Sequence, residues 1–336
     1  TPPPTTMLRI GFAWWCSQMT FRTIEGGVSI RSGVSELPHD RSGMLWSEAG
    51  PSAMFTESMD RWIGSMISDD HGEGDGPETV VEAEMVSKSI GILCGNSVAE
   101  RLLQSYFPDC SVEWSVGEGG EVSPDLCVAL LQGPARSILQ LERILLNLVG
   151  RLSGIATNAS QWSKAAGSLH VAATRKTAWG LLDKWAVHIG GGLTHRLNRS
   201  DAMMLKENDI AAMLEDDEVS TDAITRIVSQ LPAENESFTT VEVRNVDEVM
   251  AAARAWGDRD SRLVLMLDNM DPSDASGVIS SLMEEGLRER CVLEGSGGVK
   301  MESLSKWLDC GVDVVSSSRL NLGVTPIDFS ILVRGS

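Results

Sequence analysis

The chain has 336 residues, a formal net charge of −19 at pH 7 and 42% hydrophobic residues. These values are typical of a globular protein with two domains or one large barrel, and the acidic charge argues against nonspecific nucleic-acid binding, which needs a basic surface. No apolar run reaches the ~20 residues that span a bilayer, so the sequence predicts neither nucleic acid nor membrane as a partner.

The six cysteines are scattered along the chain. None belongs to a Cys-x-x-Cys pair, and none stands at metal-ligand spacing from a histidine. Isolated cysteines of this kind are typical of buried thiols in a reducing compartment, so we expect a cytoplasmic protein.

Residues 1–50 differ from the rest of the chain. They begin with Thr-Pro-Pro-Pro and contain no sustained helical or strand period. We therefore predict a poorly ordered extension over 1–50 with no catalytic role. Translation from a misplaced upstream start, with Met44 or Met54 as the true first residue, is an alternative explanation of its composition.

From Met54 onward the hydrophobic pattern becomes regular. It predicts helices over 54–67, 95–106 and 136–153, and strands over 79–86, 90–93 and 126–132. The third helix carries one apolar stripe, formed by Ile138, Leu141, Leu145, Leu148 and Leu152. These elements indicate a first α/β domain over 51–152.

Beyond Gly154, short apolar strands alternate with helices such as 246–256 and 272–285. Alternation of this kind predicts parallel strands joined by helices, here a β/α barrel over 153–323 whose site lies at the carboxyl ends of the strands. The predicted strands cover 171–173, 203–205, 239–243, 264–267, 292–294 and 312–315.

Positive charge is concentrated between Arg175 and Lys206. Six lysines and arginines stand there against two aspartates, whereas 14 acids stand against four arginines from Glu207 to Asp260. A cationic stretch at strand ends suits a polyanionic small molecule. The alternative is that these cations only pair with the surplus of acids.

Hydroxyl, glycine and carboxylate groups follow the later strands. Ser296-Gly297-Gly298 and Ser316-Ser317-Ser318 end the last two, where barrel enzymes commonly bind a phosphate. Glu242 and Asp268 end the two preceding strands, which indicates Mg²⁺ or ribose-hydroxyl recognition. Each carboxylate could instead be a helix cap or an ion-pair partner.

These residues resemble the core of the quinolinate phosphoribosyltransferases in order and spacing, from about Met54 to Ile331. The matching segments are Glu142-Arg143-Ile144-Leu145-Leu146-Asn147, Leu152 to Thr157, Thr174-Arg175-Lys176-Thr177, Gly190-Gly191-Gly192-x-x-His195-Arg196, Lys206-x-Asn208, Met266 to Met270, Glu294-Gly295-Ser296-Gly297-Gly298 and Gly311-Val312-Asp313. An early Gly72-Glu73-Gly74-Asp75 turn also matches.

The resemblance implies an α/β fold, an N-terminal open-faced sandwich followed by an incomplete, TIM-like β/α barrel, with residues 324–336 as a possible return to the first domain. It also implies the transfer of phosphoribosyl from phosphoribosyl pyrophosphate to quinolinate. Pyrophosphate and CO₂ are released, and nicotinate mononucleotide is formed for NAD synthesis. Family members assemble at least as dimers, so a homo-oligomer is expected.

Site roles carry over from the family to the matching positions. Arg175, His195, Arg196 and Lys206 would hold the quinolinate carboxylates, and Arg143 would complete the site of a neighbouring subunit. Lys176 would face phosphoribosyl pyrophosphate. The resemblance implies that Glu242 and Asp268 hold ribose hydroxyls and Mg²⁺, and that Ser296, Gly297, Gly298 and Ser318 bind the 5′-phosphate.

The sequence departs from the family pattern in four places, the first of which is an early turn, Asp75-Gly76-Pro77-Glu78-Thr79, that is longer than the typical version. Asp209 stands where the family usually has histidine, Ser318 stands where it commonly has glycine, and Asn321-Leu322-Gly323 replaces Thr-His-Ser. Two alternative functions remain from the sequence: a nicotinate phosphoribosyltransferase, or a catalytically silent paralogue that binds ligand without turnover.

Overall fold

The computed structural model describes residues 37–70, 72, 76–232 and 238–334. A four-stranded antiparallel sheet in the order β14-β3-β7-β5 forms the core of the first domain. Its strands are β3 (Val80–Ser87), β5 (Ser111–Trp114), β7 (Cys127–Pro134) and β14 (Phe329–Val333). The last of these comes from the end of the chain and pairs Phe329 with Ser87.

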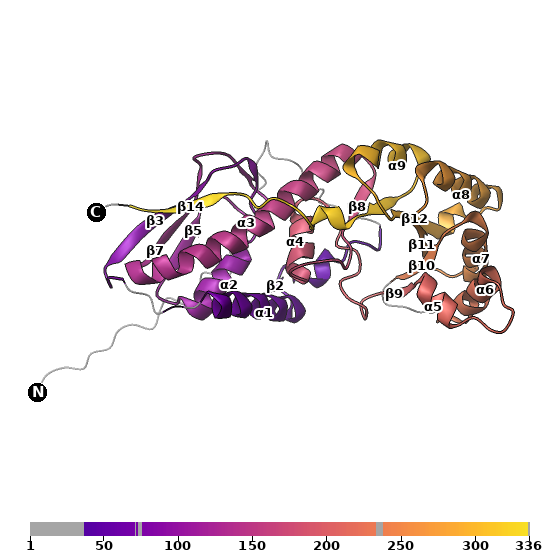
Figure 1. Cartoon of the computed structure of the whole chain (residues 1–336), viewed down its shortest axis with the longest axis horizontal. Coiled ribbons are helices and arrows are strands. Elements are labelled where there is room, and N and C mark those ends of the chain that lie inside the picture. The colour runs from indigo at the N-terminus through magenta and orange to yellow at the C-terminus, as the bar shows by residue number, and fades with distance from the viewer. Residues whose placement is uncertain (1–36, 71, 73–75, 233–237, 335–336) are drawn as a thin grey trace, which may run out of the picture. The chain divides into compact units, whose positions relative to one another are not determined.

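Helices α2 (Asn96–Tyr106) and α3 (Ala135–Ala166) pack on this sheet, and α1 (Ala53–Asp69) packs beside α2 (Figure 1). All five residues of the predicted apolar stripe on α3 are buried. The helix continues past the predicted end at 153, because Gly154 lies in a close helix contact rather than in a turn. It ends at Gly167, whose φ of 65° is a left-handed conformation that glycine adopts readily.

The second domain is built on a parallel sheet of six strands in the order β8-β13-β12-β11-β10-β9. Its strands are β8 (His170–Ala172), β9 (Met203–Leu205), β10 (Thr239–Val243), β11 (Leu263–Asp268), β12 (Cys291–Ser296) and β13 (Val314–Ser316). Strands β8 and β9 are at opposite ends of this order, and among the described residues a single parallel bridge from Ala172 to Leu193 extends the sheet beyond β8. The predicted fold, a sandwich followed by an incomplete barrel, is confirmed.

Helices α6, α7, α8 and α9 pack in succession outside the strands (Figure 1). The helices of this domain are α4 (Leu181–Ile189), α5 (Glu207–Ala212), α6 (Ser220–Gln230), α7 (Val246–Trp256), α8 (Pro272–Glu284) and α9 (Leu304–Cys310). The remaining short elements are η1 (Ser42–Met44), β1 (Trp46–Ser47), β2 (Gly50–Pro51), β4 (Gly91–Ile92), β6 (Glu121–Val122), η2 (Arg288–Arg290), η3 (Met301–Ser303) and η4 (Ser318–Leu320). Within the described residues, no helix is long and apolar enough to cross a membrane.

The prediction of a poorly ordered extension is wrong for residues 37–50. Residues 1–36 lie outside the described part of the chain. Most of the early Gly72-to-Asp75 turn lies outside it as well. Leu37, His39 and Leu45 are buried. The segment forms only η1, β1 and the start of β2, which are too short to produce a periodic pattern. Its order comes instead from contacts with residues distant in the sequence.

The chain returns from the barrel to the first sheet across α3. A Cβ atom on Gly154 would lie 2.4 Å from the carbonyl oxygen of Thr325 and 2.9 Å from Cα of Pro326. The amide of Ile327 donates to the carbonyl of Gly150, one turn earlier, at 2.9 Å. The close approach of two backbones therefore requires glycine at this point of the helix.

We predict that Gly154→Ala destabilises the protein by about 1–3 kcal/mol or more, since backbone cannot yield as a flexible side chain can. Gly277→Ala in α8 is the matched control, because a Cβ there meets nothing within 4 Å. The control should gain about 0.5–1 kcal/mol from helix propensity. Urea unfolding of both variants measures the difference, and equal stabilities would contradict the proposed contact.

Candidate active site

Several of the predicted site residues follow or end strands at one edge of the barrel sheet. Lys206 follows β9, Glu242 lies near the end of β10, and Asp268 ends β11. Asp268 is paired in register with Ser296, the last residue of β12. Because all six strands are parallel, their carboxyl ends meet at the same edge, and this brings together groups that are up to 90 residues apart, from Lys206 to Ser296.

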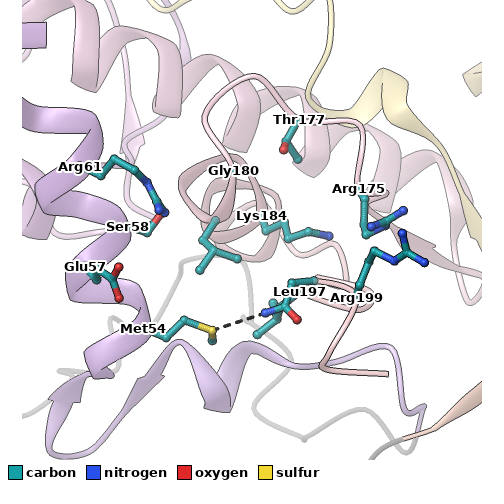
Figure 2. A pocket seen from close by; sticks show the side chains of 12 residues that line it. Met54, Glu57, Ser58, Arg61, Arg175, Thr177, Gly180, Lys184, Leu197 and Arg199 are labelled. Atoms are coloured by element: carbon teal, nitrogen blue, oxygen red, sulfur yellow. Dashed lines mark hydrogen bonds between the residues drawn. The ribbon is translucent and has the colours of Figure 1, made fainter. Parts of the chain in front are cut away.

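A pocket of about 520 Å³ opens beside this edge, between α1, α4 and the loops after β8 and before β9 (Figure 2). Four of its lining residues are cationic, and Glu57 is the one carboxylate among them. The lining consists of Met54, Glu57, Ser58, Arg61, Arg175, Thr177, Gly180, Leu181, Lys184, Leu197, Asn198 and Arg199. A pocket with this charge suits a polyanion.

The cations of this pocket are not used up by ion pairs. Among the described residues, no acidic side chain lies within ion-pair distance of Arg61, Arg175 or Arg199. The alternative that the cations of 175–206 merely pair with surplus acids therefore fails for these arginines. The same alternative holds for Lys206, whose ammonium group forms an ion pair with Glu242.

Arg61 was not predicted from the sequence. It lies on α1, more than 100 residues before the cationic stretch, and its position on the polar side of an amphipathic helix is ordinary for an arginine. No pattern distinguished it, and only the packing of α1 beside α4 brings it to the pocket.

Lys184 is almost fully buried at the back of the pocket, where its Nζ donates to the carbonyl of Thr194 at 2.7 Å. Burial lowers the pKa of Lys184 to about 7. The negative charge of Asp201 opposes this shift, whereas the positive charges of Arg175 and Arg196 add to it. At neutral pH this lysine can therefore take up a proton when an anion binds.

A buried carboxylate organises the loop after β8. Asp183 accepts hydrogen bonds from the Arg151 guanidinium at 3.0 Å and from the backbone amide of Ala178 at 2.8 Å. The Asn321 amide donates to the same carboxylate at 3.1 Å and to the carbonyl of Lys176 at 2.9 Å. The segment beginning with Asn321, which replaces the family's Thr-His-Ser, thus supplies one contact to the Lys176 backbone and one to Asp183.

The serine and glycine residues after β12 and β13 form adjacent loops. The Ser316 hydroxyl donates to the Ser296 hydroxyl at 3.3 Å, and the Ser317 hydroxyl donates to the carbonyl of Val299 at 3.1 Å. Gly297 has a φ of 84°, and a Cβ there would lie 2.3 Å from Asn269 Oδ1. These loops bring hydroxyl groups and glycines together beside the strand ends.

Ser318 begins η4 directly after these loops and is partly buried. Asp209, which stands where the family usually has histidine, caps the start of α5. Its carboxylate accepts a hydrogen bond from the backbone amide of Lys206 at 3.0 Å. The carboxylate of Asp268 accepts from the side chain of Asn269 at 2.9 Å.

Of the site residues predicted from the sequence, only Arg175 lines the pocket. His195 is buried with its Nε2 on Glu294 and its Nδ1 on the Arg196 amide, and Arg196 donates to the carbonyl of Ala202 at 3.1 Å. The contact of both side chains with substrate, which the resemblance implied, stays a prediction. Arg143 is exposed on α3.

Comparison with known families agrees with this geometry. The sequence model of the N-terminal domain of quinolinate phosphoribosyl transferase matches residues 63–153, and that of the C-terminal domain matches residues 155–332. The chain belongs to the quinolinate phosphoribosyltransferase family. The resemblance drawn from the sequence motifs is confirmed.

Relatives of this family match over most of the chain. A probable nicotinate-nucleotide pyrophosphorylase [carboxylating] of Methanothermobacter thermautotrophicus is 35% identical over 76% of this chain and 90% of its own length. Quinolinate phosphoribosyltransferase [decarboxylating] 1b of Nicotiana tabacum is 35% identical over 75% of this chain and 73% of its own length. The structure of the nicotinate-nucleotide pyrophosphorylase from Francisella tularensis matches with a TM-score of 0.72 and 27% identity, over 83% of this chain and 97% of the other.

The lowered pKa of Lys184 generates a prediction about stability. Because the pKa in the folded protein is about 7 and that of an unfolded lysine is about 10.4, the unfolded chain binds more protons between these values. Burial of Lys184 therefore destabilises the folded state increasingly as pH falls from 10 to 7. Relative to the parent, the free energy of unfolding of Lys184→Met should therefore increase by on the order of 3 kcal/mol as pH falls over this range.

Urea unfolding at pH 10 and pH 7 measures this change. Lys164→Met is the matched control, since Lys164 is exposed in the last turn of α3 and should show little difference between the two pH values. The same pH dependence in both variants would show that Lys184 keeps an ordinary pKa in the folded protein.

Proposed function

We propose that this chain transfers phosphoribosyl from phosphoribosyl pyrophosphate to quinolinate with decarboxylation, and so forms nicotinate mononucleotide, pyrophosphate and CO₂. The observation that supports this most directly is the pocket that Arg61, Arg175, Lys184 and Arg199 line at the carboxyl edge of the barrel strands. Both substrates are polyanions, and this pocket concentrates positive charge in a chain with a net charge of −19. The reaction itself is inferred from the family to which the chain belongs.

The chemistry needs neutralisation of anions more than proton transfer. Departure of pyrophosphate leaves an oxocarbenium-like ribose, and the quinolinate ring nitrogen attacks its C1′ carbon. The nitrogen then carries positive charge and stabilises the electron pair that stays on the adjacent ring carbon when its carboxylate leaves as CO₂, and that carbon takes a proton from water to give the product. Fixed cations that orient both anions lower this barrier without a general base.

We assign the carboxylates of quinolinate to the cationic pocket. Arg175 is exposed in it, and its planar guanidinium can bind a carboxylate through two hydrogen bonds. Lys184 and Arg199 contribute further positive charge from the same lining. Lys206 lies at the same sheet edge, and its ion pair with Glu242 must open for it to reach a substrate carboxylate.

We assign phosphoribosyl pyrophosphate to the neighbouring strand ends. Lys176 is exposed in the loop after β8, from which it can face the pyrophosphate. The loops of Ser296 to Gly298 and Ser318 offer amides and hydroxyls for the 5′-phosphate. Glu242 and Asp268 end adjoining strands beside them and would accept from ribose hydroxyls.

Magnesium fits this second subsite. Mg²⁺ is commonly held by one or two protein carboxylates together with substrate phosphates, and Glu242 and Asp268 provide two carboxylates on adjoining strands. Within the described residues no third His, Cys, Asp or Glu joins them, so the substrate would supply the other ligands. When bound, the ion would neutralise charge on the departing pyrophosphate.

We further propose that the protein works in the cytoplasm as a homodimer or larger homo-oligomer. The five cysteines in the described part of the chain are free, which suits a reducing compartment. Arg143 is exposed on α3, apart from the pocket of its own chain, so it is available to complete the site of a neighbouring subunit.

The direct test incubates the protein with quinolinate, phosphoribosyl pyrophosphate and Mg²⁺. We expect CO₂ and nicotinate mononucleotide in equal amounts. Arg175→Met controls for contaminating enzyme and should lose about 30- to 1000-fold in rate, as expected when a positioned charge is removed. Arg254→Ala should keep full activity, because Arg254 pairs with Glu285 on the surface.

Turnover of nicotinate without turnover of quinolinate would replace the substrate assignment by a nicotinate phosphoribosyltransferase. Binding of phosphoribosyl pyrophosphate in a calorimeter without any product would instead identify a catalytically silent paralogue.

The proposed role of Arg143 predicts complementation between subunits. Arg143→Ala and Arg175→Met should each be nearly inactive alone. Mixed after unfolding and refolding together, they should regain roughly a quarter of the parent activity, because half of random dimers are mixed and each mixed dimer has one intact site. No gain in the mixture, measured against each variant refolded alone, would show that Arg143 does not act on a neighbouring subunit.

A further inference from the structure

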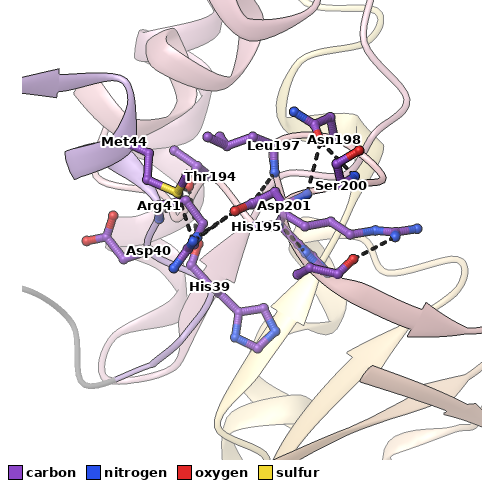
Figure 3. Close-up of polar contacts among 12 residues, drawn as sticks. His39, Asp40, Arg41, Met44, Thr194, His195, Leu197, Asn198, Ser200 and Asp201 are labelled. Carbon is purple, nitrogen blue, oxygen red and sulfur yellow. Dashed lines mark hydrogen bonds and ion pairs between the residues drawn. The ribbon is translucent and has the colours of Figure 1, made fainter. Parts of the chain in front are cut away.

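Residues 39–41, a segment in the part of the chain predicted to be disordered, contact the loop 194–201 behind the pocket (Figure 3). The His195 amide donates to the carbonyl of His39 at 2.8 Å, and the Arg41 amide donates to the Thr194 hydroxyl at 2.8 Å. The Thr194 hydroxyl in turn lies 3.3 Å from the carbonyl of His39. The segment therefore runs beside the loop and is joined to it through the backbone.

An ion pair strengthens this junction. The Arg41 guanidinium donates to Asp201 from Nε at 3.1 Å and from a terminal nitrogen at 2.8 Å. The other carboxylate oxygen of Asp201 accepts from the backbone amide of Leu197 at 2.8 Å. Asp201 thus joins Arg41 to the turn that carries Leu197, Asn198 and Arg199, which are all pocket-lining residues.

The side chain of His39 reaches a buried carboxylate that it shares with His195. His39 Nε2 lies 2.9 Å from one oxygen of Glu294, and His195 Nε2 lies 3.2 Å from the other. All three side chains are almost inaccessible to water. The two rings are 4.9 Å apart at an angle of 79°, so each imidazole approaches a different oxygen of the same carboxylate.

The protonation of this group follows from its partners. Burial alone would raise the pKa of Glu294, but the charge and hydrogen bonds of His195 and the hydrogen bond of His39 hold that pKa far below its usual value. Burial lowers the pKa of His195, and the charge and hydrogen bond of Glu294 oppose this shift. Its Nδ1 accepts from the Arg196 amide at 2.6 Å, so its proton lies on Nε2 and is donated to Glu294.

The same three side chains have ligand atoms within 4.8 Å of one another, as a metal site would. We interpret the three side chains as a hydrogen-bonded group rather than a metal site, because both carboxylate oxygens already have imidazole partners. The positive charge of Lys184 also acts on His195 and would repel a cation. Within the described residues, no fourth His, Cys, Asp or Glu completes the group.

We propose that His39 is a positioning residue for the cationic pocket, with Arg41 as its second point of attachment. The inference rests on the function proposed above, since it concerns the quinolinate part of that site. By holding Glu294, His39 fixes His195, and through the backbone of 194–201 it fixes Arg199 and the carbonyl that accepts from Lys184. Loss of His39 should therefore weaken the binding of quinolinate and leave phosphoribosyl pyrophosphate almost unaffected.

The test compares His39→Leu, His39→Gln and Arg41→Ala in the full chain. Leucine retains packing against Phe238, whose ring lies 5.3 Å from that of His39, but cannot donate to Glu294. We expect His39→Leu to raise KM for quinolinate about 10- to 100-fold, the usual effect of losing a hydrogen bond to a charged group. The kcat and the KM for phosphoribosyl pyrophosphate should change less than about 3-fold on the same scale.

His39→Gln should restore most of the affinity, because its amide can donate to Glu294. Arg41→Ala should raise KM for quinolinate in the same direction. Glu48→Ala is the matched control, an exposed side chain of the same N-terminal region, and should behave as the parent.

Amide hydrogen exchange of the peptide 193–201 gives a readout that does not depend on turnover. Exchange should be faster in His39→Leu and Arg41→Ala than in the parent and in Glu48→Ala. If the parent shows no turnover, the proposed function fails while this exchange still decides the inference.

Several results would overturn the inference. An unchanged KM in His39→Leu would do so, as would a glutamine variant that is as impaired as the leucine variant. An equal loss of all kinetic parameters with a lower Tm would show a role in stability alone. Stoichiometric zinc in the purified parent, lost in His39→Leu, would make the cluster a metal site.

Discussion

The ammonium group of Lys184 donates to the carbonyl of Thr194 at 2.7 Å in a place that water hardly reaches. Burial of a positive charge is unfavourable unless partners compensate for it, and the nearest cations, Arg175 and Arg196, increase the cost. Asp201 provides the compensating negative charge. The rest of the pocket depends on this balance, because the same carboxylate binds Arg41 and the backbone of Leu197.

The distribution of charge over the protein separates structural cations from those of the pocket. On the surface, Arg226 pairs with Glu218, Arg254 with Glu285 and Arg290 with Asp258, and exposed pairs of this kind add little stability. The pocket arginines stand apart from the many acids of the chain. An acidic protein can thereby present a concentrated positive field to two anionic substrates while its overall charge keeps it soluble.

Helix α3 joins the two halves of the molecule mechanically. Its apolar stripe packs on the first sheet, and the returning chain crosses it at Gly150 and Gly154. Arg151, on the same helix, donates to the carboxylate of Asp183. Asp183 then holds the loop of Lys176 through Asn321. A helix that belongs by sequence to the first domain thus helps to position a loop of the second.

The sequence by itself determined the family, the two-domain α/β fold and most of the strands, because strand periodicity and the alternation with helices are local properties. It also determined that Glu242, Asp268 and Ser296 lie together, since parallel strands bring their carboxyl ends to one edge. Only the tertiary structure placed Arg61 in the pocket. It also ordered residues 37–50, whose anchors His39 and Arg41 find their partners more than 150 positions away, beyond the reach of any local pattern.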